Sequence, residues 1–200
     1  MLAVLLLLFI DPADAALGRA ADCLDRDDFA AAVPHLRTYL RANPDDVLVR
    51  AQLAETLYRT GHPAARGEFE RVAADAGPRL LPRLPHCHTR LMTLAEAAGD
   101  DYRAHLHRGL GLARLADAWD ADPARRDPDR AERTRTRAVA ELRHAVAERP
   151  DDPRANLHLA IVLDQLGQTG PARAARTAAR KGLPDPSLAA AERAGIELGR

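Results

Sequence analysis

The sequence predicts an all-α protein assembled from repeated helix pairs, and three observations support this. The helix formers Ala, Leu, Arg and Glu are abundant, whereas the β-branched and aromatic residues that strands favour are scarce. Apolar residues make up 46% of the 200 residues, enough for a packed core. Turn residues also recur at a fixed interval, because Pro150 and Pro184 lie 34 residues apart, as do Asp27 and Gly61.

The amino-terminal stretch MLAVLLLLFIDPADAA matches a secretory signal. Its apolar run, 2–10, is shorter than the ~20 residues that cross a bilayer, and it precedes a helix-breaking proline and an A-x-A cleavage pattern ending at Ala15. We therefore predict a signal peptide over 1–15 and a periplasmic or secreted helical domain over 16–200. No Lys or Arg precedes the run, so two alternatives stay open: an apolar helix that caps the array in a cytoplasmic protein, or a start codon placed too far downstream.

Small and bulky apolar residues recur in the same order in three segments, each around a turn residue. The first segment contains Ala20, Cys23, Asp27, Ala32, Leu36 and Pro44. The second contains Leu53, Ala54, Leu57, Gly61, Ala65 and Phe69. The last contains Leu159, Ala160, Leu163, Gly167, Ala172 and Pro184. Small residues let paired helices approach, and the bulky ones fill the remaining space, so each segment predicts a helix-turn-helix unit.

The middle of the chain is less regular. Leu91 and Gly99 place a further helix and turn before a helix that starts near Asp101. Two prolines then predict a loop over 121–129, because proline removes a backbone donor and clashes with the preceding helical turn. A long helix over 130–148 should follow and pack antiparallel against the helix before the loop.

Aspartates predict several helix starts. Asp46 and Asp152 precede helical segments, where a carboxylate accepts hydrogen bonds from free backbone amides. A final helix reaching about Leu198, with Leu188 and Ile196 on its apolar side, would close the array, since the end of a repeat stack needs a cap.

Over residues 13 to 186 these patterns resemble the tetratricopeptide repeat. The resemblance implies a right-handed α-solenoid of stacked helix-turn-helix repeats with a C-terminal capping helix. It also implies that the first helix of each pair lines a concave groove that binds a peptide or partner protein. The residues placed in that groove are Gln52, Glu55, Tyr58, Arg59, Arg154, His158, Ile161, Asp164 and Gln165. At the groove-facing positions, the first two units have neither the Lys nor the Asn with which some family members clamp a carboxylate terminus.

No catalytic motif is present, so the sequence does not predict an enzyme or a cofactor. Ser187 is the only serine and lies at a predicted helix start, and phosphate-binding, zinc-protease and hydrolase signatures are absent. His86 and His88 form one closely spaced pair, and His105 and His107 form another. Residues two apart on a helix point in nearly opposite directions, which favours solvated or helix-end histidines over a metal site.

Charged residues make up 29% of the chain and cancel to a net charge of zero, which argues against a nucleic-acid surface that depends on a basic excess. The segment Arg125–Arg143 nevertheless contains seven arginines and four acids. Such a run is most simply a solvated helix face with internal ion pairs. The sequence therefore favours a non-catalytic protein-protein interaction scaffold, with polyanion or nucleic-acid binding through Arg125–Arg143 as the alternative.

Overall fold

The chain is all-α. The computed structural model describes residues 11–74, 82–124, 126–183, 185, 188 and 190–198. Their regular structure consists of α-helices without a β-strand, which confirms the predicted fold class. The chain divides into two compact units, Met1–Val72 and Ala73–Arg200, which are described in turn.

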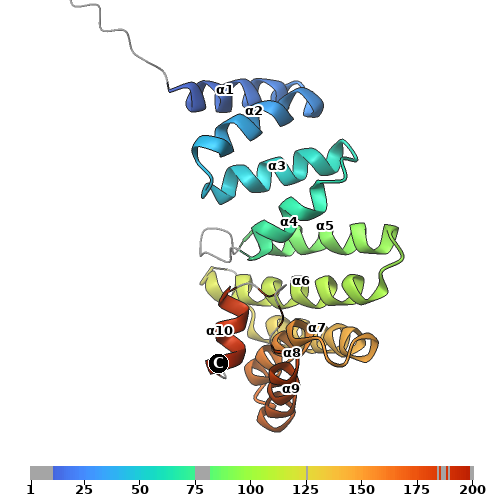
Figure 1. Ribbon diagram of the computed structural model, residues 1–200. Helices are drawn as coiled ribbons and strands as arrows, with labels where there is room; N and C mark the ends of the chain where they lie inside the picture. The colour runs from blue at the N-terminus through green and yellow to red at the C-terminus, as the bar shows by residue number, and fades with distance from the viewer. Residues whose placement is uncertain are drawn as a thin grey trace, which may run out of the picture. The chain divides into compact units, whose positions relative to one another are not determined.

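The first unit contains successive antiparallel helices (Figure 1). These are α1 (Pro12–Asp25), α2 (Phe29–Ala42), α3 (Val47–Arg59) and α4 (Ala65–Ala74), whose last two residues cross the unit boundary. The small residues Ala20 and Ala54 have no exposed surface, and the bulky Leu36 and Phe69 are 1% exposed. The repeated small and bulky positions therefore form the core, as predicted.

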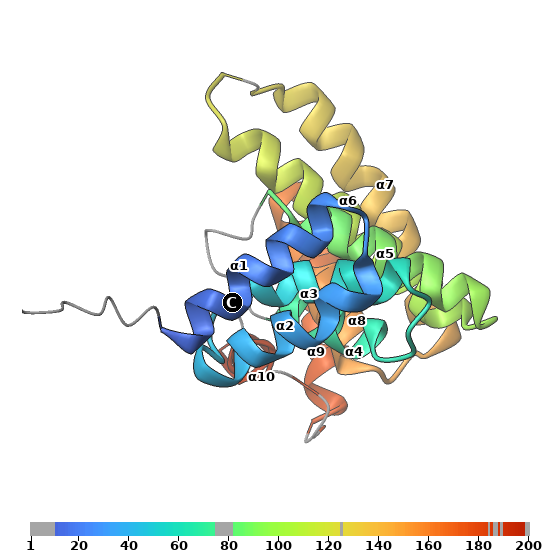
Figure 2. The ribbon, with the colours of Figure 1, turned by 90° about the horizontal axis from the view of Figure 1, so that it is seen from above.

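The second unit contains the remaining helices of the described residues. These are α5 (Leu84–Ala97), α6 (Asp101–Ala121), α7 (Pro128–Glu148), α8 (Pro153–Gln165), α9 (Thr169–Lys181) and α10 (Ala190–Leu198). α6 and α7 form the long antiparallel hairpin seen in Figure 2. A Cβ atom added at Gly109 would lie 2.7 Å from Leu142 Cγ, so the missing side chain lets these two helices approach closely. Pro128 begins α7 instead of interrupting it, because the first helical residue needs no backbone donor.

Four turns between paired helices share one backbone geometry. Asp27, Gly61, Gly99 and Gly167 have φ values of 56°, 66°, 66° and 70°. In each turn the amide after this residue donates to a carbonyl five residues earlier, as in Gln168 N to Leu163 O at 2.9 Å. This arrangement satisfies the free carbonyls at a helix end and favours glycine, which has no Cβ penalty there. The turns predicted at these four positions are confirmed.

Aspartate side chains cap helix after helix. Asp46 Oδ1 accepts from the amides of Leu48 and Val49, each at 3.1 Å, and Asp152 Oδ1 accepts from Arg154 and Ala155. The predicted caps are therefore present. Asp28, Asp100 and Asp127 accept similar bonds at the starts of α2, α6 and α7.

The C-terminal helix covers the end of the second unit. Leu188, which lies before α10 and not on it as predicted, and Ile196 within the helix are 5% and 3% exposed and pack with Leu157 of α8 and Ala179 of α9. Arg180 Nε also donates to Ile196 O at 3.2 Å, which ties α9 to the last turn of α10. The predicted capping role of this segment is confirmed, while Ser187 lies outside the described residues.

The predicted cleavage point after Ala15 lies within the first turns of α1. Residues 1–10 are outside the described part of the chain, whereas Asp11 caps α1 through a 2.8 Å hydrogen bond from Ala13 N. Ala13 and Ala16 are buried in the first unit. Cleavage there would remove this cap and a core side chain. Among the described residues, no helix has the length and apolar character needed to cross a membrane.

Candidate functional site

The predicted binding residues form two sets that lie in different units, on α3 and on α8. On α3, Gln52 is exposed, and Glu55 pairs with Arg59 over 3.3 Å between Oε1 and Nε. The guanidinium of Arg59 also lies 4.9 Å from the ring centre of Phe29. The Tyr58 ring packs edge-on against Phe69, with 6.3 Å between ring centres. α3 therefore presents a polar face whose aromatic and arginine side chains are already positioned by neighbouring helices.

On α8, the residues nearest the helix start contact the protein's own last helix. Arg154 Nε donates to Glu192 Oε1 at 2.9 Å, and His158 Nε2 lies 3.3 Å from the same oxygen. Ile161 packs beside the apolar cluster that α10 covers. α10 thus occupies part of the α8 face through one carboxylate and an apolar contact.

Farther along α8, the same face borders α6. A small cavity of about 30 Å³ lies between the two helices, which is room for about one water molecule. Its lining residues are Leu110, Ala113, Arg114 and Asp117 of α6 and His158, Ile161, Val162 and Gln165 of α8. This part of the face combines aliphatic walls with a polar edge.

That polar edge is a hydrogen-bond network joining three helices. Gln165 Nε2 donates to Asp117 Oδ1 at 3.2 Å, and Arg135 Nε of α7 donates to Gln165 Oε1 at 3.2 Å. Arg135 also pairs with Asp117 at 3.2 Å although its side chain is only 12% exposed. Asp164 is paired with Arg176 of α9. His158, Ile161 and Gln165 therefore lie together at one cavity. Gln165 and Asp164 already bind other side chains of the protein.

The predicted solvation of the histidines is wrong for His88 and His107. Their Nδ1 atoms are 3.4 Å apart, their rings are stacked with centres 5.5 Å apart, and they are 5% and 9% exposed. Gly111 makes room for this contact, since an added Cβ would lie 3.2 Å from His88 Cβ. Burial, and then the neighbouring His107, Arg114 and His158, hold the pKa of His88 well below its usual value. His88 is therefore neutral in the folded protein.

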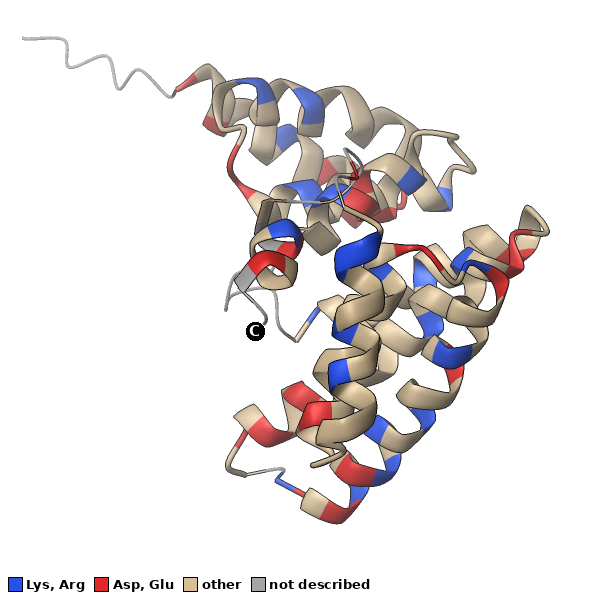
Figure 3. Ribbon diagram, turned by 60° about the horizontal axis from the view of Figure 1, so that its bottom comes forward, with Lys and Arg blue, Asp and Glu red and all other residues tan. Residues whose placement is uncertain are grey.

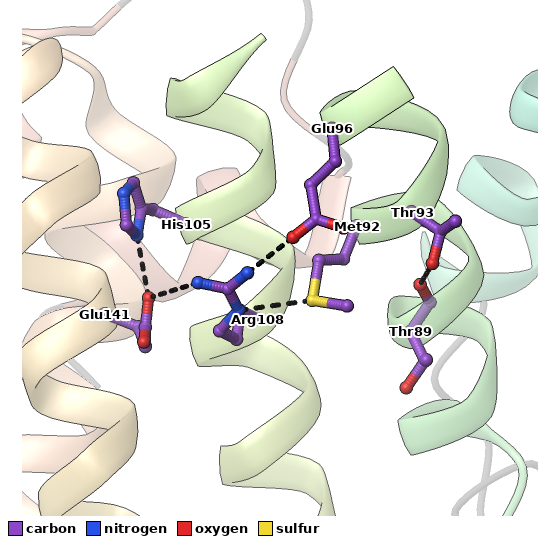
Figure 4. A network of polar contacts seen from close by, with 7 residues as sticks. All are labelled: Thr89, Met92, Thr93, Glu96, His105, Arg108 and Glu141. Atoms are coloured by element: carbon purple, nitrogen blue, oxygen red, sulfur yellow. Dashed lines mark hydrogen bonds and ion pairs between the residues drawn. The ribbon is translucent and has the colours of Figure 1, made fainter. Parts of the chain in front are cut away.

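A second polar cluster ties α5, α6 and α7 together (Figure 4). Glu141 Oε2 lies 2.7 Å from His105 Nδ1 and accepts from Arg108 Nη1 at 3.5 Å. Arg108 in turn donates to Glu96 at 2.5 Å and to the Met92 sulfur at 3.3 Å. Within the described residues, no three or more His, Cys, Asp or Glu side chains are grouped so that they could hold a metal ion. These histidines and carboxylates instead join helices, a role that sequence spacing did not reveal.

Comparisons with known proteins give distant likenesses. No protein-family model matches the sequence, and no curated protein matches it significantly. A crystal structure of MamA protein is similar at 14% identity over 93% of this chain and 94% of that one, with a TM-score of 0.43. "MamA 41-end" from Desulfovibrio magneticus RS-1 is 18% identical over 89% and 98%, with a TM-score of 0.38. A monomeric IFIT1 mutant with Gppp-AAAA is 17% identical over 89% and 44%, with a TM-score of 0.35. Likenesses at these identities and TM-scores carry no information about the function of this chain.

Proposed function

We propose that this protein is a non-catalytic scaffold of the tetratricopeptide type that binds a peptide or partner protein. The binding faces are the polar face of α3 in the first unit and the α8 face, bordered by α6, in the second. The observation that carries this proposal is that α8 already holds an amphipathic helix, α10, through the bonds from Arg154 and His158 to Glu192. A face that binds one helix through a charged contact and an apolar contact has the chemistry that helix or peptide recognition requires.

The composition of the α8 face agrees with protein binding. Ile161 and the neighbouring aliphatic walls supply an apolar anchor, and Arg114 and Gln165 supply polar groups at the edge. Lys and Arg are interspersed with Asp and Glu along the helices (Figure 3). Mixed charge of this kind favours short-range, specific contacts over long-range attraction to one kind of polyion.

The test is affinity capture from extracts of the native cell with the full chain as bait. One bait carries Ile161→Asp with Gln165→Ala, and another carries Gln52→Ala with Glu55→Ala. The matched control carries Arg173→Ala with Thr177→Ala on the exposed side of α9. We expect a partner that the wild type and the control retain and that both face variants lose. Equal capture by all baits would contradict the assignment of these faces.

We further propose that the protein is exported to the periplasm or secreted. The support is the apolar run with its A-x-A pattern. Intact mass and amino-terminal sequencing of the protein from separated cell fractions determine both where the chain begins and in which compartment the protein lies. A chain beginning at Ala16 outside the cytoplasm supports export, and an uncut cytoplasmic chain contradicts it.

A further inference from the structure

The outer face of α7 carries a stripe of exposed arginines. Arg130, Arg133 and Arg137 are all exposed, and at about 100° per residue they fall within roughly 60° of the helix circumference. The stripe is about 10 Å long at ~1.5 Å per residue. It lies apart from the α8 face described above, since the α7 side chains that contact α8 are buried apolar residues and Arg135.

These arginines differ from those that hold the fold together. Arg108, Arg135 and Arg154 each pair with a carboxylate on another helix. By contrast, no hydrogen bond or ion pair within the described residues engages the guanidinium of Arg133 or Arg137. These two side chains are therefore available to groups outside the chain.

At one end of the stripe, the side chain of Arg130 is held in place by an aromatic ring. Its guanidinium lies 4.2 Å from the centre of the Trp119 ring, on the neighbouring helix α6. Stacking on an indole restrains the guanidinium plane while leaving its N–H groups free to bind a carboxylate in bidentate fashion. A restrained donor loses less conformational entropy on binding than a mobile one.

We propose that this stripe, Arg130, Arg133 and Arg137, binds an acidic helical segment of a partner protein. Carboxylates at positions i, i+4 and i+7 of a helix repeat over the same ~10 Å as the three guanidinium groups. Arginine is suited to such pairs because its fork matches the two oxygens of a carboxylate.

The surroundings of the stripe favour a short acidic segment over a nucleic acid. Asp129 and Glu132 are exposed on the same helix and lie to one side of the stripe, about 40° and 100° beyond Arg133, where they would repel a continuous phosphate backbone. The chain has no net charge to supply the basic excess on which nucleic-acid binding depends. A helix with a few carboxylates can meet the arginines and avoid the flanking acids.

The test measures fluorescence anisotropy of a labelled 16-residue helical peptide, with Glu at i, i+4 and i+7 and Ala elsewhere, titrated with the full chain. The α7 variant is Arg133→Glu with Arg137→Glu. The control is Arg19→Glu with Arg37→Glu, which makes the same change in charge at exposed arginines of the first unit. A peptide with Gln for Glu and a single-stranded RNA of equal charge serve as comparison ligands, and circular dichroism monitors folding.

We expect the Glu peptide to bind wild type and control alike, more weakly as salt rises, and to bind the α7 variant at least about tenfold more weakly. If charge reversal unfolds the chain, Arg133→Gln with Arg137→Gln replaces it, with a smaller loss expected. The proposal is overturned if the Glu peptide binds no more tightly than the Gln peptide, or if the control loses as much affinity as the α7 variant. Tighter binding of RNA than of peptide, dependent on Arg133 and Arg137, would assign the stripe to nucleic acid instead.

Discussion

The stacked pair His88 and His107 makes the stability of the second unit depend on pH. Because their Nδ1 atoms are 3.4 Å apart, one ring must donate and the other must accept, so the contact requires a neutral acceptor. The pKa of His88 is lowered by burial and then by three facing groups, His107, Arg114 and His158. As the pH falls, His88 should therefore bind a proton in the unfolded chain at a higher pH than in the folded chain.

The sign and size of this effect follow from proton linkage. Well above pH 6.5, the ordinary histidine pKa, His88 is neutral in both the folded and the unfolded state, and its contribution to stability is constant. Below that pH the unfolded chain binds a proton that the folded chain does not, so stability falls by up to about 1.4 kcal/mol per pH unit. Between pH 7.5 and 5.5 the loss attributable to His88 should be about 1.4 kcal/mol.

The assay is urea unfolding followed by the fluorescence of Trp119, the only tryptophan, which lies on α6, the helix that also carries His107. Wild type, His88→Gln and a control, His86→Gln, are compared at pH 7.5 and 5.5. His86 is a suitable control because its side chain is exposed in the wild type. His88→Gln should lose about 1.4 kcal/mol less on acidification than the other two, whatever its own stability at pH 7.5. Equal losses in all three proteins would refute the reasoning that the buried ring is neutral.

Three further predictions concern stability. Asp27→Gly should raise the free energy of unfolding by up to about 1 kcal/mol, because Asp27 has a left-handed φ of 56° where the equivalent turns have glycine. Gly182→Ala should lower the free energy of unfolding by about 1–3 kcal/mol, since its Cβ would lie 2.5 Å from Asp151 O, whereas Gly170→Ala, with open space around it, should not. Glu192→Gln should lower the free energy of unfolding by about 1 kcal/mol or less and speed amide hydrogen exchange in α10. Glu197→Gln, on the exposed side of α10, should leave the free energy and the exchange rate unchanged.

Most of the fold could be predicted because its determinants are local. A left-handed turn residue, an aspartate cap and alternating small and bulky side chains are all properties of a few consecutive residues. Gly61, Gly99 and Gly167 therefore mark turns in the sequence as clearly as they do in the structure. The division into two units could not be predicted from such local patterns, because it depends on contacts between helices that are distant in the sequence.

The histidines show where local reasoning fails. His86 and His88 are two residues apart, and spacing alone describes only how they diverge on their own helix. Whether His88 meets a partner depends on the register of α5 against α6, and the missing side chain of Gly111 leaves room for their close approach at His88. A glycine within a predicted helix is a sequence signal for a close packing contact, and Gly111 is such a glycine.

The binding face illustrates the same limit from the functional side. The repeat pattern places Arg154 and His158 on the first helix of a pair, facing away from the core, and both are indeed only partly buried. Their bonds to Glu192 depend on a segment more than thirty residues later, which no local pattern connects to them. Since α10 meets these two residues with a carboxylate and packs Ile196 one helical turn later against Leu157, it has the chemistry of a bound amphipathic helix. The way the chain closes its own end is therefore the best guide to the kind of segment that the α8 face can hold.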